Sequence, residues 1–293
     1  MSTAIDFIVR QAVPGDRSQL AELVHFEANV HRHLDWRPPL DWLGESPFLV
    51  AEKGGVLLAT LACPQDPQGI AWVRLFAASS VLPVSRAWAA LWEAVQGWFA
   101  TQDGKPVTIA AIPLQSWFET ELQKTAFVRE TRVVMLTRDC RVPLSASRVN
   151  LDVTIRPMLL EDFSAVSLVD CAAFVPLWQN SHCCLQMAYG QAVYASVMEL
   201  HGRIIAYQIS TGTSGGAHLA RLAVVPEQQG HGYGQALVYD LLREFHQRGV
   251  RFVSVNTQEN NESSLAVYRK MGFQPTGEAM PVYVRDLSFP VSG

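Results

Sequence analysis

Two stretches of the chain repeat apolar residues at the three- and four-residue spacing of a helix that is buried on one face. One follows residue 234, and Arg248-Gly249 then supplies a cation for its last turn and a glycine suited to a left-handed C-cap. The apolar positions are Leu237, Val238, Leu241, Leu242 and Phe245 in this stretch, and Trp88, Leu91, Trp92, Val95, Trp98 and Phe99 in the first half of the chain. Both stretches are predicted to be long amphipathic helices.

The helix that follows residue 234 is preceded by a glycine-rich segment, residues 229–234, which follows an apolar strand pattern at residues 219–225. Its glycines alternate, at Gly230, Gly232 and Gly234, and leave backbone N–H groups uncovered at the start of a helix. Unpaired amides and the positive end of the helix dipole favour a phosphate there. The segment is therefore predicted to bind an anion, and the alternative is that the glycines only form a tight connection.

Two common phosphate loops do not fit this segment. A P-loop needs a lysine followed by serine or threonine, but Gln235-Ala236 follows the last glycine. A dinucleotide fingerprint needs Gly-x-Gly-x-x-Gly, whereas these glycines are spaced two apart.

An internal repeat accounts for the length of the chain, because residues of the first half return 146 or 147 positions later. The matched pairs are Arg10 with Arg156, Asp16 with Asp162, Glu52 with Glu199, Ala59 with Ala206, Lys124 with Lys270 and Phe127 with Phe273. Each copy reads as a strand, a helical region, a hairpin, a fourth strand, a long helix, a fifth strand, a helix and a closing strand. We therefore expect two α/β domains, 1–140 and 151–293, joined by a linker at 141–150.

The two copies differ in the residues that could carry chemistry. Ser85 and Ala87 stand at the repeat positions of Gly232 and Gly234, so the first copy lacks the glycine-rich loop. Leu122 stands where the second copy has Tyr268, and residues 1–150 contain no tyrosine. The first copy is expected to be a degenerate, inactive version of the second.

The second copy resembles the GNAT superfamily of acetyl-CoA-dependent N-acetyltransferases. Its Gln229-x-x-Gly232-x-Gly234 fits the family's (Gln/Arg)-x-x-Gly-x-(Gly/Ala) loop, and the segment from Asn261 through Tyr268 to Gly272-Phe273 is similar to the family's later signature. The resemblance covers most of residues 152–288, and it extends to the ribosomal-protein alanine N-acetyltransferases, while the tandem plan is similar to that of mycothiol synthase. It implies two tandem GNAT domains, each a mixed central sheet flanked by helices.

The resemblance also implies roles for individual residues. The fourth strand of the family bulges and separates from the fifth, so that acetyl-CoA can pair with exposed backbone; Leu222, Ala223 and Val224 would lie there. The Val224 N–H would stabilise the oxyanion, Asn261 would border the cofactor, and Tyr268 would protonate the departing thiolate. The loop expected to hold the pyrophosphate consists of Gln229, Gly230, His231, Gly232, Tyr233 and Gly234.

The base that deprotonates the amine is less well defined by the sequence. His218 lies on the fourth strand, an even number of residues before Leu222, so it is expected to share one sheet face with Leu222 near the catalytic bulge, and its pKa near neutrality suits a base. Glu199 is the rival, although Glu52 occupies its place in the inactive copy and suggests a structural role for both. Water acting through a relay remains a third possibility.

Composition narrows the class of protein. A net charge of −4 and a pI near 6.1 give no basic footprint for nucleic acid. Residues 171–198 lack Asp, Glu, Lys and Arg, but polar residues and proline interrupt them too often for a membrane span, so they are expected to form an acceptor-side wall. No signal-peptide pattern is present, and five cysteines fit reduced thiols in the cytoplasm.

No metal site is expected from the sequence. Cys183-Cys184 has no second cysteine pair at ligand spacing, and His31-x-His33 near Asp35 is more typical of a solvated or packed pair than of metal ligands.

The sequence therefore predicts an N-acetyltransferase that uses acetyl-CoA and acts, through its second copy, on a primary amine of a small molecule or a peptide N-terminus. A monomer or a homodimer is expected, without nucleic-acid or membrane partners. A protein of another class stays open as an alternative: a sensor or scaffold that binds CoA without turnover.

Overall fold

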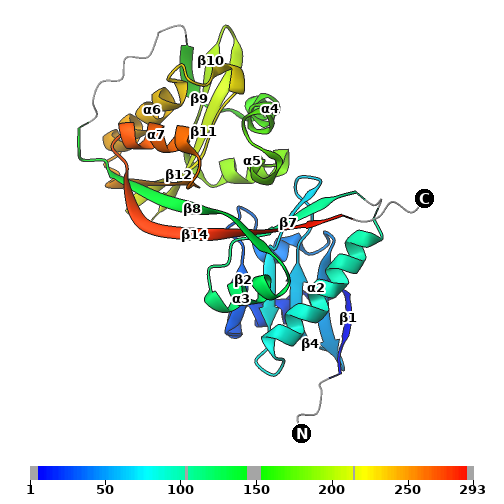
Figure 1. The fold of residues 1–293 in the computed structure, drawn as a ribbon. Coiled ribbons are helices and arrows are strands. Elements are labelled where there is room, and N and C mark those ends of the chain that lie inside the picture. Colours follow the sequence, from blue (N-terminus) through cyan, green and yellow to red (C-terminus); the bar gives the residue numbers. More distant parts are fainter. Residues whose placement is uncertain (1–5, 103–104, 144–152, 214, 289–293) are drawn as a thin grey trace. The chain divides into compact units, whose positions relative to one another are not determined.

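The computed structural model describes residues 6–102, 105–143, 153–213 and 215–288, and its fold is drawn in Figure 1. The chain divides into two compact units. The first consists of Met1–Glu130 with Pro281–Gly293, and the second consists of Thr131–Met280. Within the described residues, no helix combines the length and the apolar character needed to cross a membrane.

The first unit contains a five-stranded sheet in the order β1-β3-β4-β6-β2 and a second group of strands in which β7 pairs with β5 and β14. Its helices α1 and α2 pack on the five-stranded sheet, and α2 buries the predicted stripe that includes Trp88, Leu91 and Phe99. The elements are β1 (Ile8–Gln11), α1 (Arg17–Phe26), β2 (Asn29–Arg32), β3 (Phe48–Lys53), β4 (Val56–Ala62), β5 (Ile70–Trp72), β6 (Leu75–Ala78), α2 (Val84–Ala100), β7 (Val107–Ala111) and α3 (Ser116–Lys124).

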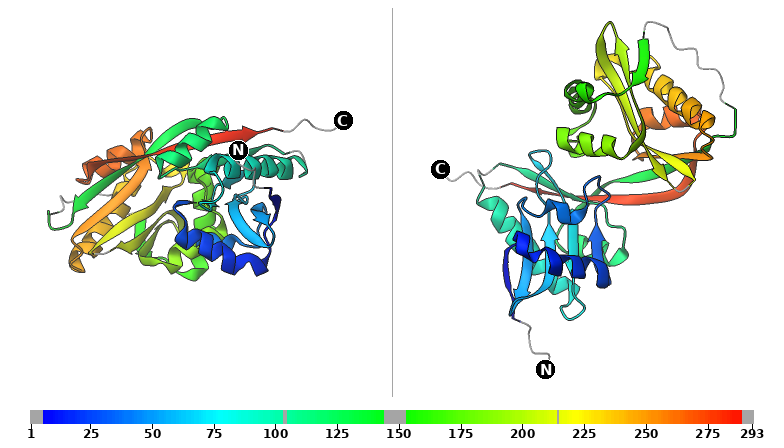
Figure 2. Two further views of the ribbon diagram at one scale, coloured as in Figure 1. Left: turned by 90° about the horizontal axis from the view of Figure 1, so that it is seen from below. Right: turned by 180° about the vertical axis from the view of Figure 1, so that it is seen from behind.

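The second unit is built on strands in the order β8-β13-β12-β11-β10-β9. Helices α6 and α7 lie on one face of this sheet and α4 and α5 on the other (Figures 1 and 2). The elements are β8 (Val128–Asp139), β9 (Val153–Pro157), α4 (Phe163–Ala173), α5 (His182–Gly190), β10 (Ala192–Leu200), β11 (Arg203–Thr213), β12 (Gly216–Val224), α6 (Tyr233–Gln247), β13 (Phe252–Gln258), α7 (Glu262–Lys270) and β14 (Gln274–Leu287).

Short 3-10 turns precede or connect several of these helices. They are η1 (Pro14–Asp16), η2 (Pro39–Trp42), η3 (Leu160–Asp162), η4 (Pro176–Trp178) and η5 (Pro226–Gln228).

The predicted hairpin of the second copy is present as β10 and β11. Its two turn residues, His201 and Gly202, have φ values of 49° and 74°. Positive φ at both central residues is the requirement of a type I′ turn, whose twist matches that of the strands it joins. The turn sets the register from Leu200, opposite Arg203, as far as Ser196, opposite Gln208, with one bulge between Met198 and Glu199.

Strands β8 and β14 each contribute to both units. In the second unit, β8 pairs with β13 from Val133 opposite Gln258 to Asp139 opposite Phe252. In the first unit, residues Tyr283–Leu287 of β14 pair with β7. By the repeat, however, β8 is the closing strand of the first copy and β14 that of the second. The boundaries at 140 and 151 describe the repeat in sequence and remain a prediction; the linker lies outside the described residues from position 144.

Candidate functional site

The parallel strands β12 and β13 pair over only three positions and then separate. Their register runs from Ala217 opposite Val253 to Leu219 opposite Val255. On the other side of β12, pairing with β11 continues, but Ile209 is opposite Arg221 and the next residue, Ser210, is opposite Leu219. Ala220 is therefore an extra, bulged residue, and bulges bend a strand and end pairing locally. Beyond it, the β13-facing edge of residues 222–224 has no partner strand among the described pairings.

The direction of the backbone donors on this edge follows from one hydrogen bond. The Val225 N–H donates to the Ile205 carbonyl at 2.9 Å, on the β11 side. Because successive N–H groups of a strand point to opposite sides, those of Val224 and Leu222 point away from β11, into the opening. The opening is thus an unfilled strand position with donors already in place.

The glycine-rich loop leads directly from this edge to α6. Gly230 and Gly232 have φ values of 79° and 85°, a left-handed backbone that glycine adopts without strain. Gly232 is the N-cap of α6, no side chain caps the helix, and the first bond of the helix runs from the Ala236 N–H to the Gly232 carbonyl. The first turn contains no acidic side chain. This arrangement presents backbone donors and the positive end of the helix dipole, as an anion site requires.

Contacts within the loop fix its position against β12. The Gln229 side chain donates from Nε2 to the Val224 carbonyl at 3.0 Å, and His231 Nδ1 lies 3.0 Å from the Gln229 carbonyl. His231 also stacks on Tyr233, with ring centroids 5.8 Å apart. A methyl group placed on Gly234 would lie 3.7 Å from Val224, an ordinary contact, so alanine fits there. The structure therefore brings the loop and the splayed strand together.

Tyr268 is held at the end of α7 by a Schellman motif. The Phe273 N–H donates to the Tyr268 carbonyl and the Gly272 N–H to the Arg269 carbonyl, both at 3.0 Å, with Gly272 at φ 83°. This is the 6→1 and 5→2 pattern of the motif, and its usual apolar contact is made by the Phe273 and Tyr268 rings, 5.7 Å apart. The Tyr-to-Gly-Phe spacing thus fixes the phenol through local backbone geometry.

The Tyr268 side chain is 4 % exposed and belongs to the buried cluster against which Leu222 packs. Burial raises the pKa of its hydroxyl well above the usual value near 10. A phenol with a raised pKa stays protonated near neutral pH and can donate its proton. The structure thus brings Tyr268 to the α6 face of the splayed strand.

Asn261 is the N-cap of the same helix. Its Oδ1 accepts from the Ser264 N–H at 3.2 Å and from the Ser263 hydroxyl at 3.0 Å. These bonds satisfy donors at the start of α7, which accounts for asparagine at this position.

His218 lies on the opposite face of β12 from Leu222, contrary to the sequence-based expectation. On β11, their partners Thr211 and Gln208 are three residues apart, an odd number, because the Ala220 bulge adds a residue to β12. The bulge inverts the alternation of side chains that the prediction assumed. His218 Nδ1 lies 2.9 Å from the Ser254 hydroxyl, and burial lowers the pKa of the imidazole, so it is neutral near pH 7.

Glu199 is engaged in an ion-pair network away from the splayed edge. Its Oε1 accepts from Arg156 at 2.6 and 2.9 Å, and the same guanidinium donates to both oxygens of Asp162 at 2.7 and 2.8 Å. The hydrogen bonds to Arg156 lower the pKa of Asp162.

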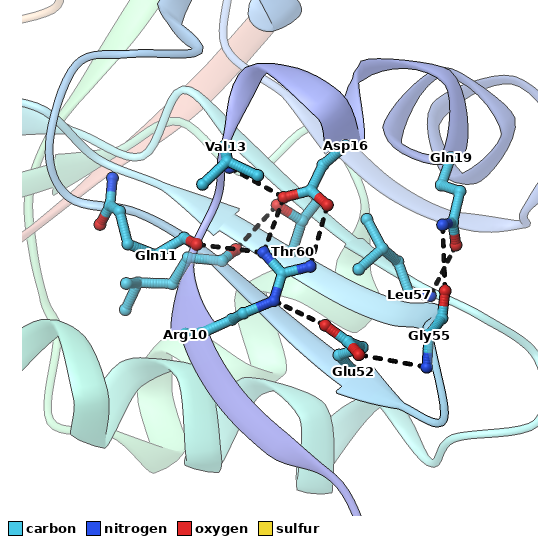
Figure 3. Close-up of polar contacts among 10 residues, drawn as sticks. Arg10, Gln11, Val13, Asp16, Gln19, Glu52, Gly55, Leu57 and Thr60 are labelled. Atoms are coloured by element: carbon cyan, nitrogen blue, oxygen red, sulfur yellow. Dashed lines mark hydrogen bonds and ion pairs between the residues drawn. The ribbon is translucent and has the colours of Figure 1, made fainter.

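The first unit repeats this network with Arg10, Asp16 and Glu52 (Figure 3). The Arg10 guanidinium donates to Asp16 at 2.8 and 2.9 Å and to Glu52 at 2.6 Å. The network is therefore common to both units and does not depend on the glycine-rich loop or on Tyr268, which only the second unit has.

One buried ion pair beside the bulge was not singled out from the sequence. Asp170 of α4 is fully buried and accepts from Arg221 at 2.7 and 2.8 Å, from the Tyr207 hydroxyl, and from the Asn180 N–H at 2.8 Å. Arg221 also donates to the Trp178 carbonyl at 2.6 Å. The pair therefore ties the residue after the bulge to the uncharged segment 171–198. An arginine within an apolar strand and an aspartate within an apolar helix are the signal that could have revealed it.

Residues 158–273 match the model of the acetyltransferase (GNAT) family. A putative ribosomal protein bS18-alanine N-acetyltransferase of Bacillus subtilis is 23% identical over 123 residues, which are 42% of this chain and 82% of that protein. A mycothiol acetyltransferase of Saccharomonospora viridis is 42% identical over 53 residues, 18% of this chain, and the match spans only 17% of that protein.

Among solved structures, a tandem GNAT protein from the clavulanic acid biosynthesis pathway superposes with a TM-score of 0.62 at 16% identity. The match covers 96% of this chain and 98% of that one. Identity at this level reports the fold alone, and it confirms the predicted fold of two tandem domains with mixed sheets flanked by helices.

Proposed function

We propose that this chain is an acetyl-CoA-dependent N-acetyltransferase that acts through its second unit, because residues 158–273 match the acetyltransferase (GNAT) family model and the chain has the fold of a tandem GNAT protein. The observation that supports this most directly is the open edge of β12, which leads to the glycine-rich start of α6, where no side chain caps the helix; Leu222 of this edge packs against the buried cluster that contains Tyr268.

This edge suits both parts of acetyl-CoA. The N–H groups of Leu222 and Val224 would pair with the amide groups of the extended pantetheine arm, as an added strand would. The loop from Gln229 to Gly234 would hold the pyrophosphate at the start of α6, where backbone donors and the helix dipole act together. Asn261 would border the cofactor from the start of α7.

The chemistry follows from what these groups would face. The amine nitrogen attacks the thioester carbon, and the Val224 N–H would donate to the oxyanion that forms. When the carbon–sulfur bond breaks, Tyr268 would give its proton to the departing thiolate, and the proton released by the amine balances this loss through solvent. Because its pKa is raised by burial, the Tyr268 hydroxyl is protonated near neutral pH and has a proton to give.

For the amine proton we propose His218, acting through water. Its imidazole is neutral, and the Ser254 hydroxyl orients the ring from β13. Because of the bulge, His218 lies on the same face of β12 as Arg221, and Arg221 contacts the uncharged segment 171–198 on that face. Glu199 is proposed as a structural residue, because Arg156 already holds its carboxylate.

The proposed acceptor is a primary amine of a small molecule or a peptide N-terminus. The two named relatives differ on this point, one acting on the alanine of a ribosomal protein and the other in mycothiol acetylation. We place the acceptor at the face of β12 covered by the uncharged segment 171–198, and we propose a cytoplasmic location.

The test measures acetyl-CoA binding by calorimetry and thiol release over a panel of amines. Tyr268→Phe should lower kcat about 10²-fold while leaving the Kd for acetyl-CoA nearly unchanged, since only the proton is lost. Tyr239→Phe is a matched control, because Tyr239 packs against the same buried cluster from α6. Equal activity of the Tyr268 variant and wild type would remove Tyr268 from the reaction.

The same experiment addresses the sensor alternative. Binding of acetyl-CoA without turnover of any amine would favour a sensor, and the engagement of Glu199 with Arg156 is the observation in its favour. Cys171 and Cys183 are exposed, so thiol reagents require a baseline recorded without amine.

A further inference from the structure

The first unit contains the counterparts of β12 and β13, and these strands separate as β12 and β13 do. In the first unit, however, another strand lies in the opening between them. Strand β5 pairs in parallel with β7, from Ile70 opposite Thr108 to Trp72 opposite Ala110. The chain then continues as β6, which pairs with β4. On the opposite edge of β6 lies β2, antiparallel, with His31 opposite Phe76 and Asn29 opposite Ala78. A segment of the chain itself therefore occupies the strand position that is open in the second unit.

The register shows which donors β2 covers. In β4 and β6, Leu61 is opposite Phe76 and Ala59 opposite Ala78, just as Gln208 is opposite Leu222 and Ala206 opposite Val224 in the second unit. The Ser79 N–H donates to the Leu58 carbonyl on the β4 side, so by alternation the N–H groups of Ala78 and Phe76 point toward β2. They are the counterparts of the Val224 and Leu222 donors.

Both ends of β2 are fixed by polar contacts. Before it, the Glu27 carboxylate accepts from the Ser80 N–H at 2.9 Å. After it, the His33 N–H donates to the Arg74 carbonyl at 3.0 Å, and Arg74 donates to Asp35 at 2.8 Å in an ion pair that is less than 8 % exposed on either side.

The two histidine side chains of this segment, His31 and His33, are packed against aromatic rings. His31 is fully buried, stacks on Phe118 at 4.2 Å, and lies 3.1 Å from the Val73 carbonyl. His33 stacks on Trp72 at 4.7 Å. Burial lowers the pKa of His31 to about 4, so the ring is uncharged near pH 7 and acts as an aromatic filler.

The anion loop is missing from the first unit as well, independently of β2. Ser85 and Ala87, the repeat counterparts of Gly232 and Gly234, lie inside α2, and the N-cap of that helix is Pro83, which has no N–H to offer. No loop with left-handed glycines separates the strand from the helix here.

We propose that Asn29–Arg32 is a built-in substitute for the pantetheine arm, which closes the first unit to coenzyme A and leaves the chain with one acetyl-CoA site. The location of that one site rests on the proposed function, whereas the occupied edge of β6 does not. The strand also gives the first unit a complete sheet without a ligand, so its stability is independent of the cofactor.

The test combines calorimetry with hydrogen exchange on the full chain, with acetyl-CoA as the probe. We expect one molecule bound per chain and no measurable binding to Gly232→Val. Gly202→Val is the matched control, because Gly202 has a similar φ of 74° and equally open space but lies in the β10–β11 turn. The amides of Asn29–Arg32 should exchange slowly with and without acetyl-CoA, while those of Leu222–Val224 should slow when it binds.

Two molecules bound per chain, binding retained by Gly232→Val, or faster exchange of Asn29–Arg32 when acetyl-CoA is added would overturn the proposal. Rapid exchange of these amides in the free protein would also overturn it. A wild-type chain that binds no acetyl-CoA but protects Asn29–Arg32 would instead refute the proposed function and support the closed first unit.

Discussion

Ala126 has a left-handed backbone conformation, and its repeat counterpart with the same conformation is a glycine, Gly272. Ala126 follows α3 with φ 60°, and the Phe127 N–H donates to the Leu122 carbonyl at 3.1 Å, the same Schellman bond that Phe273 makes to Tyr268. A left-handed residue other than glycine costs about 1–2 kcal/mol. Glycine loses about 0.5–1 kcal/mol more conformational freedom than alanine on folding. Ala126→Gly should therefore stabilise the protein by roughly 0.5–1 kcal/mol.

The control is the same substitution at an ordinary helical position. Ala89 is exposed in the middle of α2, so Ala89→Gly should destabilise the protein by about 1 kcal/mol. Urea unfolding followed by tryptophan fluorescence suits this comparison, because seven of the eight tryptophans lie in residues 1–150. The midpoint should rise for Ala126→Gly and fall for Ala89→Gly at unchanged m-value. A lower midpoint for both would show that the strain argument is wrong.

The reciprocal change belongs to the same prediction. Gly272→Ala should destabilise the protein by about 1–2 kcal/mol, since its φ is 83°. The added methyl group would also lie 3.2 Å from Arg138 Nε, which donates to the Met271 carbonyl. Turnover should fall as well, because the motif positions Tyr268, and unchanged stability and turnover together would contradict this account.

Three other parts of the second unit give measurable outcomes. A chain that begins at residue 141 lacks the β8 partner of β13, so it should be recovered in soluble form far less than one that begins at residue 128; equal recovery on size-exclusion chromatography would argue against this role of β8. Because the pKa of Asp162 is lower in the folded protein than its unfolded value near 3.9, the ionised carboxylate stabilises the fold above that value, and this stability is lost as the pH falls through the folded pKa. Asp162→Asn should therefore flatten the fall of Tm between pH 7 and pH 3. His218→Gln should lower kcat/KM and weaken its rise between about pH 5 and pH 7, with the Kd for acetyl-CoA unchanged; an unaltered pH profile would exclude His218 as the base.

The parts of the site that depend on short-range sequence were predictable. The glycine loop, the start of α6 and the placement of Tyr268 by Gly272-Phe273 each rest on hydrogen bonds between residues only a few positions apart. Local rules of capping and left-handed glycine are sufficient for such features. The fold was also predictable, because the hydrophobic pattern was present twice.

The parts that the sequence did not reveal depend on long-range pairing. The Ala220 bulge is defined only by its partners on β11, and it reversed the face expected for His218. The position of β2 beside β6 joins residues more than forty positions apart, and nothing in the residues Asn29–Arg32 predicts that pairing. Alternation along one strand cannot report which strand lies next to it.

The use of β8 by the second unit has a consequence for how this gene can change over time. By the repeat the strand belongs to the first copy, yet it covers an edge of β13 in the unit that carries the proposed chemistry. Removal of the first copy up to residue 140 would therefore also remove a strand from the second unit, even if the first copy carried out no reaction of its own.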